Sequence, residues 1–167
     1  SRYRSTDLVS MGGTFAMNYI TDALWALFAT CGSALLFRVP KKELFAASLG
    51  GAVGWVVYLL VQGSAHSETV AALIASIAVA VYAEVIGFLK QKPATLYSTC
   101  AIIPLVPGAG MYYTMFEAVQ GSAEKAWATG FATLSIAGAI AAGLAIVASL
   151  TRIIKLDGRH FRKSRGD

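Results

Sequence analysis

The sequence is poor in charged side chains and in the residues that carry most enzyme chemistry. Only 14% of its 167 residues are Asp, Glu, Lys or Arg, whereas a soluble domain of this size carries about a quarter. Its two cysteines, Cys31 and Cys100, lie inside or at the edge of apolar blocks, with no metal-site spacing and no disulfide indicated. Neither histidine has a metal-ligand or nucleophile neighbour in the sequence, and no pair of catalytic acids stands out. We therefore expect no enzyme activity, no bound metal and no cofactor.

Hydrophobic residues dominate the chain instead. They make up 56% of it, with a mean hydropathy of +0.61, and they stand in long blocks that do not alternate with charges. The net charge of +5 could suggest nucleic acid, but the basic residues stand at the ends of the apolar blocks, where membrane topology puts them. The composition predicts an integral membrane protein that contacts lipids and binds no nucleic acid.

Five apolar blocks have the length of about 17 to 25 residues that a membrane-spanning helix needs. They run near 15–37, 44–61, 70–89, 99–119 and 127–150. We predict an all-α, polytopic membrane protein with five transmembrane helices, the fourth of them broken. Its parts are an N-terminal segment over 1–14, a five-span membrane domain over 15–151 and a basic tail over 152–167.

Lys and Arg are distributed unequally between the two sides that five spans define. Three lie on the side of the N-terminus and eleven on the other side, and short loops rich in Lys and Arg stay in the cytoplasm. We therefore expect the N-terminus outside and the C-terminus in the cytoplasm. The basic tail is either a solvated topology anchor, which we prefer, or a contact for anionic lipid head groups.

Small residues recur at a spacing that brings helices together. Gly50 and Gly54 form a G-x-x-x-G pattern in the second block, and Ala139 and Gly143 repeat the spacing in the fifth. Such residues let two helix backbones approach closely. They indicate a tightly packed core, a partner subunit, or both.

Two prolines and two glycines interrupt the centre of the fourth block. Pro104 and Pro107 each remove a backbone donor, and Gly108 and Gly110 allow the chain to turn, so we expect no regular helix between about 104 and 110. The first half-helix would end near Ile103, with free carbonyls. The second would begin near 108–111, with free N–H groups that can hold a carboxylate.

Broken helices of this kind build substrate sites in transporters. An amino acid could use both ends, whereas a dicarboxylate would use mainly the N–H groups. The alternative is a kinked but otherwise ordinary helix. The predicted substrate-binding residues are Ile103, Pro104, Leu105, Val106, Pro107, Gly108, Gly110, Tyr112 and Tyr113.

Ionisable residues inside spans face an interior, a cavity or a partner, because an exposed charge in lipid is costly. Asp22 lies one helical turn after Asn18 in the first span, and Glu84 lies on a stripe of small residues in the third. We predict that Asn18, Asp22 and Glu84 form a polar or proton path. The alternative is that they lock helix contacts through hydrogen bonds.

The motif at residues 103–108, Ile-Pro-Leu-Val-Pro-Gly, is followed by Gly110 and by Tyr112 or Tyr113. With the five spans, it resembles the small five-span subunit type of the threonine/serine exporter family, over nearly the whole chain. The resemblance implies an ion-driven exporter subunit of the bacterial inner membrane that acts with a larger membrane subunit of the same family. The implied cargo is a small carboxylate, either threonine and serine or a succinate-like dicarboxylate.

An odd number of spans places two such halves in inverted orientation, which suits alternating access. A homo-oligomer is a further possibility for the assembly. The competing function is a scaffold or assembly subunit, with transport carried by the partner chain.

Overall fold

The structure, a computed structural model, describes residues 19–65 and 67–163, and within these residues it contains helices and no strand. The all-α class predicted from the sequence is confirmed for this part of the chain. The elements in chain order are α2 (Tyr19–Leu36), α3 (Lys41–Ala65), α4 (Glu68–Lys90), α5 (Thr95–Ala101), the 3₁₀ helix η1 (Ile103–Leu105), α6 (Gly108–Val119) and α7 (Ala123–Lys163).

Three of these helices are long and apolar enough to cross a membrane, over Lys41–Ser64, Glu68–Lys90 and Ala123–Ile153. A fourth span results if Thr95–Leu105 and Gly108–Val119, which meet at a bend of 49°, are taken together. The apolar part of α2, Asp22–Leu36, is shorter, and the predicted first span over 15–37 begins outside the described residues. The described part of the chain thus gives three or four candidate spans, where the sequence predicts five.

The last helix is longer than predicted. α7 passes residue 151, the predicted end of the membrane domain, and continues as one helix to Lys163. Its apolar stretch, Ala123–Ile153, has 31 residues and measures about 46 Å at the helical rise. The hydrocarbon core of a bilayer is only about 30 Å thick, so this stretch must tilt or be covered by protein at one end.

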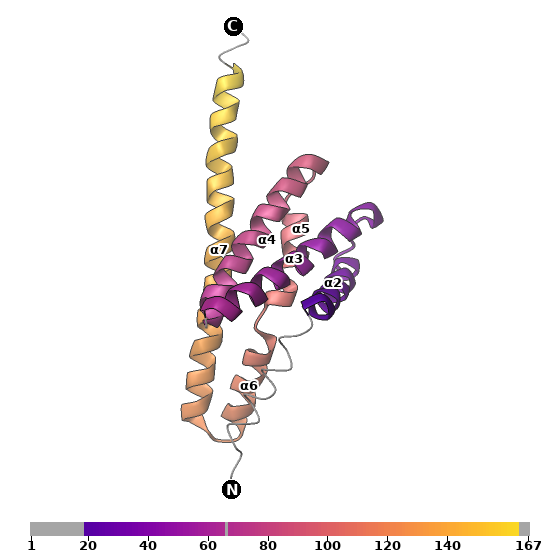
Figure 1. Cartoon of the computed structure of the whole chain (residues 1–167). Coiled ribbons are helices and arrows are strands. Elements are labelled where there is room, and N and C mark those ends of the chain that lie inside the picture. The colour runs from indigo at the N-terminus through magenta and orange to yellow at the C-terminus, as the bar shows by residue number, and fades with distance from the viewer. Residues whose placement is uncertain (1–18, 66, 164–167) are drawn as a thin grey trace.

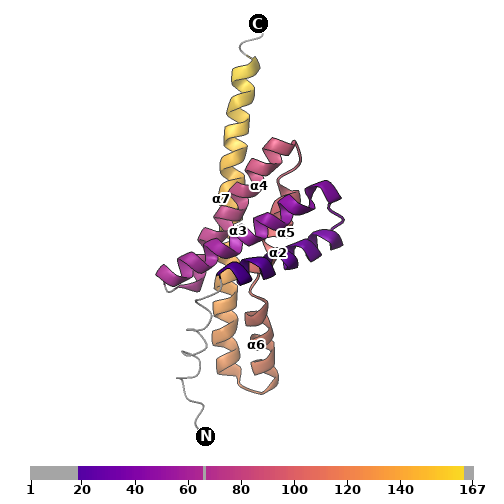
Figure 2. The ribbon, with the colours of Figure 1, turned by 45° about the vertical axis from the view of Figure 1, so that its right-hand side comes forward.

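The helices form a bundle with one hairpin that projects from it. Figures 1 and 2 show α2, α3 and α4 packed side by side and inclined to α7, with α4 crossing the middle of α7. α5 packs against α3 and α4, whereas α6 runs back along the first part of α7. The α6–α7 turn therefore lies beyond the ends of α2 to α5.

Small residues set the distances between neighbouring helices. A Cβ on Gly51 of α3 would collide with the Thr30 hydroxyl of α2, and one on Gly143 of α7 would collide with the Ser76 hydroxyl of α4. Both hydroxyls donate to carbonyls of their own helix, Thr30 to Ala26 at 2.7 Å and Ser76 at 2.8 Å. The helices can therefore approach closely without leaving a polar group unpaired.

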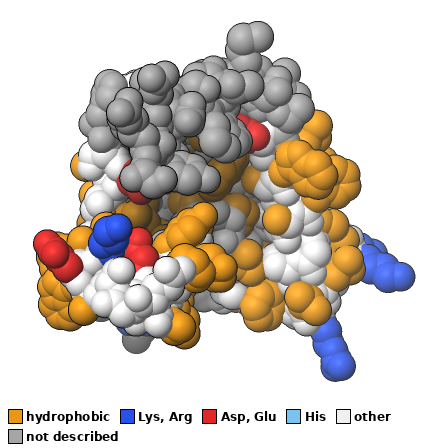
Figure 3. Space-filling view, turned by 90° about the horizontal axis from the view of Figure 1, so that it is seen from below, with side chains coloured by type: hydrophobic (Ala, Val, Ile, Leu, Met, Phe, Trp, Pro, Cys, Tyr) orange, Lys and Arg blue, Asp and Glu red, His pale blue; other side chains and the backbone are white. Residues whose placement is uncertain are grey.

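Large hydrophobic side chains face outward over much of the molecule. Trp25, Phe45 and Trp127 are each more than two-thirds exposed. Seen from below, hydrophobic side chains lie at the left, lower and right parts of the described surface, with polar and charged groups between them (Figure 3). A soluble protein rarely exposes apolar patches this large, so this surface fits a multi-pass membrane protein surrounded by lipid or by another membrane chain.

The contact of Gly51 with Thr30 gives a first prediction. Gly51→Ala should lower the stability of the full chain by about 1–3 kcal/mol, because the added methyl forces α2 and α3 apart. Gly32→Ala is the matched control, since a Cβ there meets nothing within 4 Å and Ala favours helix over Gly by about 1 kcal/mol. Thermal unfolding in detergent measures both, and equal midpoints for the two variants would contradict the packing.

Candidate functional site

The fourth apolar block is interrupted between η1 and α6. Val106 is extended, with φ −61° and ψ 128°, and Pro107 follows with φ −75° and ψ 62°. The break is present but shorter than the predicted 104–110, because η1 includes Pro104 and α6 begins at Gly108. Proline fits the first turn of a helix, because the N–H groups of that turn have no acceptor within the helix and no hydrogen bond is lost.

The ends of the two half-helices lie close to the predicted residues. The first half continues through η1 to Leu105, two residues past Ile103, and the Val106 N–H donates to the Ile103 carbonyl at 3.2 Å. The second half begins at Gly108, within the predicted 108–111. At the start of α6, the Gly108 N–H donates to Val106 O at 2.7 Å, and Met111 N–H donates to Pro107 O at 3.1 Å. The amides of Ala109 and Gly110 are thus the remaining first-turn donors of α6.

A partly open cavity of about 330 Å³ adjoins the break and is lined by four parts of the chain. It is lined by Trp55 and Tyr58 of α3, Glu68 of α4, Pro104, Leu105, Val106, Pro107, Gly108, Ala109 and Gly110 of the break, and Thr129, Ala132, Thr133 and Ile136 of α7. Six of the predicted site residues are therefore gathered around one cavity, Pro104, Leu105, Val106, Pro107, Gly108 and Gly110.

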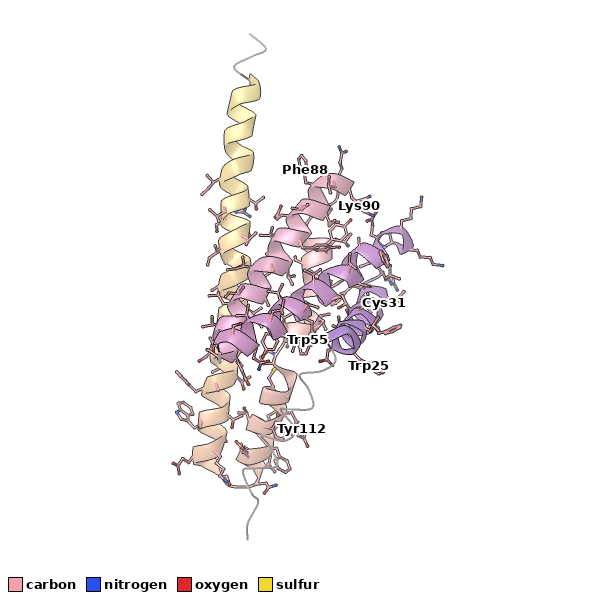
Figure 4. The ribbon with its side chains drawn as sticks, in the orientation of Figure 1. Trp25, Cys31, Trp55, Phe88, Lys90 and Tyr112 are labelled. Carbon is pink, nitrogen blue, oxygen red and sulfur yellow. The ribbon has the colours of Figure 1, made fainter. Side chains whose placement is uncertain are left out.

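Three predicted residues lie elsewhere. Ile103 is in η1 but is not part of the cavity lining. Tyr112 and Tyr113 are 62% and 54% exposed further along α6, and Figure 4 shows Tyr112 on the projecting hairpin. Their rings contact each other at 5.4 Å between centroids, and neither tyrosine is part of the cavity lining.

The aromatic wall of the cavity comes from α3. The rings of Trp55 and Tyr58 are stacked, with centroids 5.4 Å apart and planes at 24°. Figure 4 shows Trp55 where α3 passes the region between η1 and α6. Trp25 of α2 is 74% exposed.

The α7 wall carries hydroxyl groups. Thr133 is buried and donates to Thr129 O at 2.7 Å, and Thr129 donates to the Glu117 carboxylate of α6 at 2.8 Å. A Cβ on Gly110 would collide with the Thr133 hydroxyl. These contacts fix the first turn of α6 against α7, so the α6 amides and the two threonines share one side of the cavity.

Asp22 lies beside the break. It lines a second cavity of about 270 Å³ together with Trp25, Ala26, Ala29, Trp55 and Pro104. Trp55 and Pro104 belong to both cavities. The structure therefore brings Asp22 next to the break, whereas its predicted partner Asn18 lies outside the described residues.

Glu84 lies away from the break. It lines a cavity of about 530 Å³ at the turn from α4 to α5, together with Gly87, Phe88, Leu89, Gln91, Lys92, Pro93 and Ala94. This turn is tight, since Gln91 is left-handed with φ 52° and a Cβ on Gly87 would come within 2.9 Å of Lys92 O. Asp22 and Glu84 thus line different cavities.

A partly buried polar cluster ties three helices together near the α4–α5 turn. Glu43 Oε2 of α3 accepts a hydrogen bond from the Tyr97 hydroxyl of α5 at 2.8 Å and lies 2.8 Å from Lys90 Nζ of α4. Tyr97 is fully buried. We call Glu43, Lys90 and Tyr97 the carboxylate latch, because it holds the first half of the broken segment to α3 and α4.

Several of these residues are missed by reading the sequence. Trp55 and Tyr58 look like ordinary packing residues of a span, and Glu68 falls in a predicted connection. Thr129 and Thr133, spaced by one helical turn inside an apolar block, are a signal that could have been used. Within the described residues, no group of three or more His, Cys, Asp or Glu is placed to hold a metal ion.

Residues 22–150 match a protein-family model described as "Threonine/Serine exporter, ThrE". The matched region runs from α2 into α7 and contains every residue that lines the cavity at the break. No solved structure matches the chain.

The carboxylate latch gives a second prediction. Tyr97→Phe should destabilise the full chain by about 1 kcal/mol, because the fully buried Tyr97 loses its hydrogen bond to the Glu43 carboxylate. Tyr113→Phe makes the same chemical change at an exposed site and should leave the unfolding midpoint unchanged. Thermal unfolding in detergent compares the two, and a Tyr97→Phe midpoint equal to that of Tyr113→Phe would mean that the latch contributes nothing.

Proposed function

This chain belongs to the threonine/serine exporter family, and we propose that it is one subunit of a secondary-active exporter for small hydrophilic carboxylates. Threonine and serine are the first candidates for the cargo, and succinate-like dicarboxylates are the second. The membrane is the bacterial inner membrane. The chain crosses it five times, with α2 as the first span and the bent pair of α5–η1 and α6 as the fourth.

The observation that carries the proposal is the cavity at the break. It combines the free amides at the start of α6 with the Thr129 and Thr133 side of α7 and the aromatic pair of α3. Its volume of about 330 Å³ lies within the usual range for small-molecule sites. Free amides at a helix N-terminus favour a carboxylate, which is the group that all the candidate cargoes share.

The proposed orientation gives the two ends of the bundle different roles. With the N-terminus outside, the α3–α4 turn and Glu68 are on the outer side, and the carboxylate latch is on the cytoplasmic side. In this conformation the latch joins the cytoplasmic ends of α3, α4 and α5. Alternating access would require the cargo to reach the cavity from that side, so the latch must open or be bypassed during export.

The polar path is proposed to begin beside the site. Asp22 adjoins the break through Trp55 and Pro104, which suits a carboxylate whose protonation is linked to cargo binding. Asn18 would extend the path outward and Glu84 would continue it towards the cytoplasmic end of α4.

A larger membrane subunit of the same family is the proposed partner. Its support is the projecting hairpin, where α6 has no buried residue and Met115, Val119 and Trp127 are more than two-thirds exposed. The same surface also suits a homo-oligomer, or a scaffold that leaves transport to the partner. The scaffold function would leave the cavity at the break without a role.

The third prediction tests the cavity directly. Gly108 lines it, and an added Cβ there meets open space, so Gly108→Leu should fill part of it without disturbing the fold. We expect efflux of labelled threonine and serine to fall about tenfold or more, equivalent to about 1.4 kcal/mol of lost interaction. The assay uses cells that express this chain together with the larger subunit.

Gly32→Leu is the matched control, because Gly32 also has open space but lies in α2, outside the cavity lining. It should leave efflux intact. If Gly108→Leu also leaves efflux intact in an assembled complex, the substrate site is not at the break. The scaffold function is then favoured over a transport role for this chain. Efflux of labelled succinate in the same cells distinguishes the two cargo classes.

A further inference from the structure

Among the described residues that line the cavity at the break, only Glu68 has a formally charged side chain. It is the first residue of α4, where an acidic side chain interacts favourably with the helix dipole. That interaction explains an acidic residue at the start of a helix, but it does not explain why this one lies in the cavity wall. Glu68 is exposed and stands in the cavity wall, so a ligand in the cavity can reach its carboxylate.

The neighbouring wall favours a cation. Trp55 and Tyr58 contribute to the same lining, and their stacked rings are held 5.4 Å apart. Aromatic faces attract ammonium groups, and the attraction strengthens when the cation is partly removed from water. A carboxylate beside two aromatic rings is thus a set of groups suited to a primary ammonium.

The cavity has a negative and a positive side. Glu68 lies at the start of α4, whereas the first-turn amides of Ala109 and Gly110 belong to α6. A zwitterion carries one group for each side. A dicarboxylate would bring a second negative charge towards Glu68, and such like-charge contacts are a common way of rejecting a wrong ligand.

We propose that Glu68 binds the ammonium group of the cargo and so selects amino acids over carboxylates that lack an amine. This inference rests on the proposed function, because it assumes that the cargo occupies the cavity at the break. It adds a specificity-determining residue to that site. It also distinguishes the two cargo classes, since only an amino acid has an ammonium group that can pair with the Glu68 carboxylate.

The test removes the two interacting groups one at a time. The assembled complex is reconstituted in liposomes, and its transport of labelled threonine is followed. The inhibition constant of unlabelled threonine is compared with that of 3-hydroxybutyrate, which is threonine without its amine. We expect the wild-type protein to prefer threonine by about tenfold or more, the worth of one charge-assisted contact. In Glu68→Gln this preference should fall towards one, and Glu68→Asp should restore part of it.

Glu124→Gln is the matched control, because Glu124 is also an exposed acidic residue in the first turn of a helix but lies outside the cavity lining. It should keep the wild-type preference. A Glu68→Gln variant that is merely less stable would lose affinity for both compounds equally, and this unchanged ratio would overturn the inference.

The failures of the two proposals are distinguishable. If Gly108→Leu blocks transport while Glu68→Gln keeps the wild-type preference for threonine, the site at the break stands and the role of Glu68 is wrong. If the wild-type complex transports succinate but neither threonine nor serine, the exporter function stands and the role of Glu68 is wrong. If it transports none of the three compounds, the proposed function fails and the inference fails with it.

Discussion

The backbone of Val106 and Pro107 is the constraint on which the rest of the structure depends. Val106 is extended and Pro107 is in a tight turn, between two helical segments that bend by 49°. Irregular backbone cannot face lipid, because its polar groups would have no partners there. Protein or a watery cavity must therefore adjoin the break, and residues of α3, α4 and α7 form the other walls of such a cavity, while Val106 itself remains 48% exposed. The enclosing helices and the site have the same physical origin.

Close helix packing makes this enclosure possible. Gly51 lies against Thr30 and Gly143 lies against Ser76, so the helices around the break come nearer than larger side chains would allow. Gly110 lies against Thr133 in the same way, but this contact is part of the cavity wall. Small residues thus have two roles here. Some hold the bundle together, and one sets the position of the α6 amides relative to the α7 hydroxyls.

The sequence predicts the break well and the cavity only in part. Pro104, Pro107 and Gly108 are local signals, and their effect on backbone geometry needs no knowledge of the fold. Even so, the irregular stretch is shorter than predicted, because Pro104 fits the first turn of η1. Trp55, Glu68 and Thr133 are distant in sequence from the break, and only the helix arrangement brings them to it. The partners of Glu43 are missed for the same reason, since Tyr97 is 54 residues away.

The two halves of the broken segment are held very differently. The α5 half is anchored through Tyr97, which is fully buried and bonded to Glu43. The α6 half has no buried residue and contacts mainly α7. Because α6 also carries the amides that face the cavity, a movement of the α6–α7 hairpin would change access to the cavity while the carboxylate latch stayed intact. The non-helical residues Val106 and Pro107 lie where such a movement would need a hinge. The break that forces the chain to enclose a cavity is thus also the point at which the enclosure can open with the smallest loss of buried contacts.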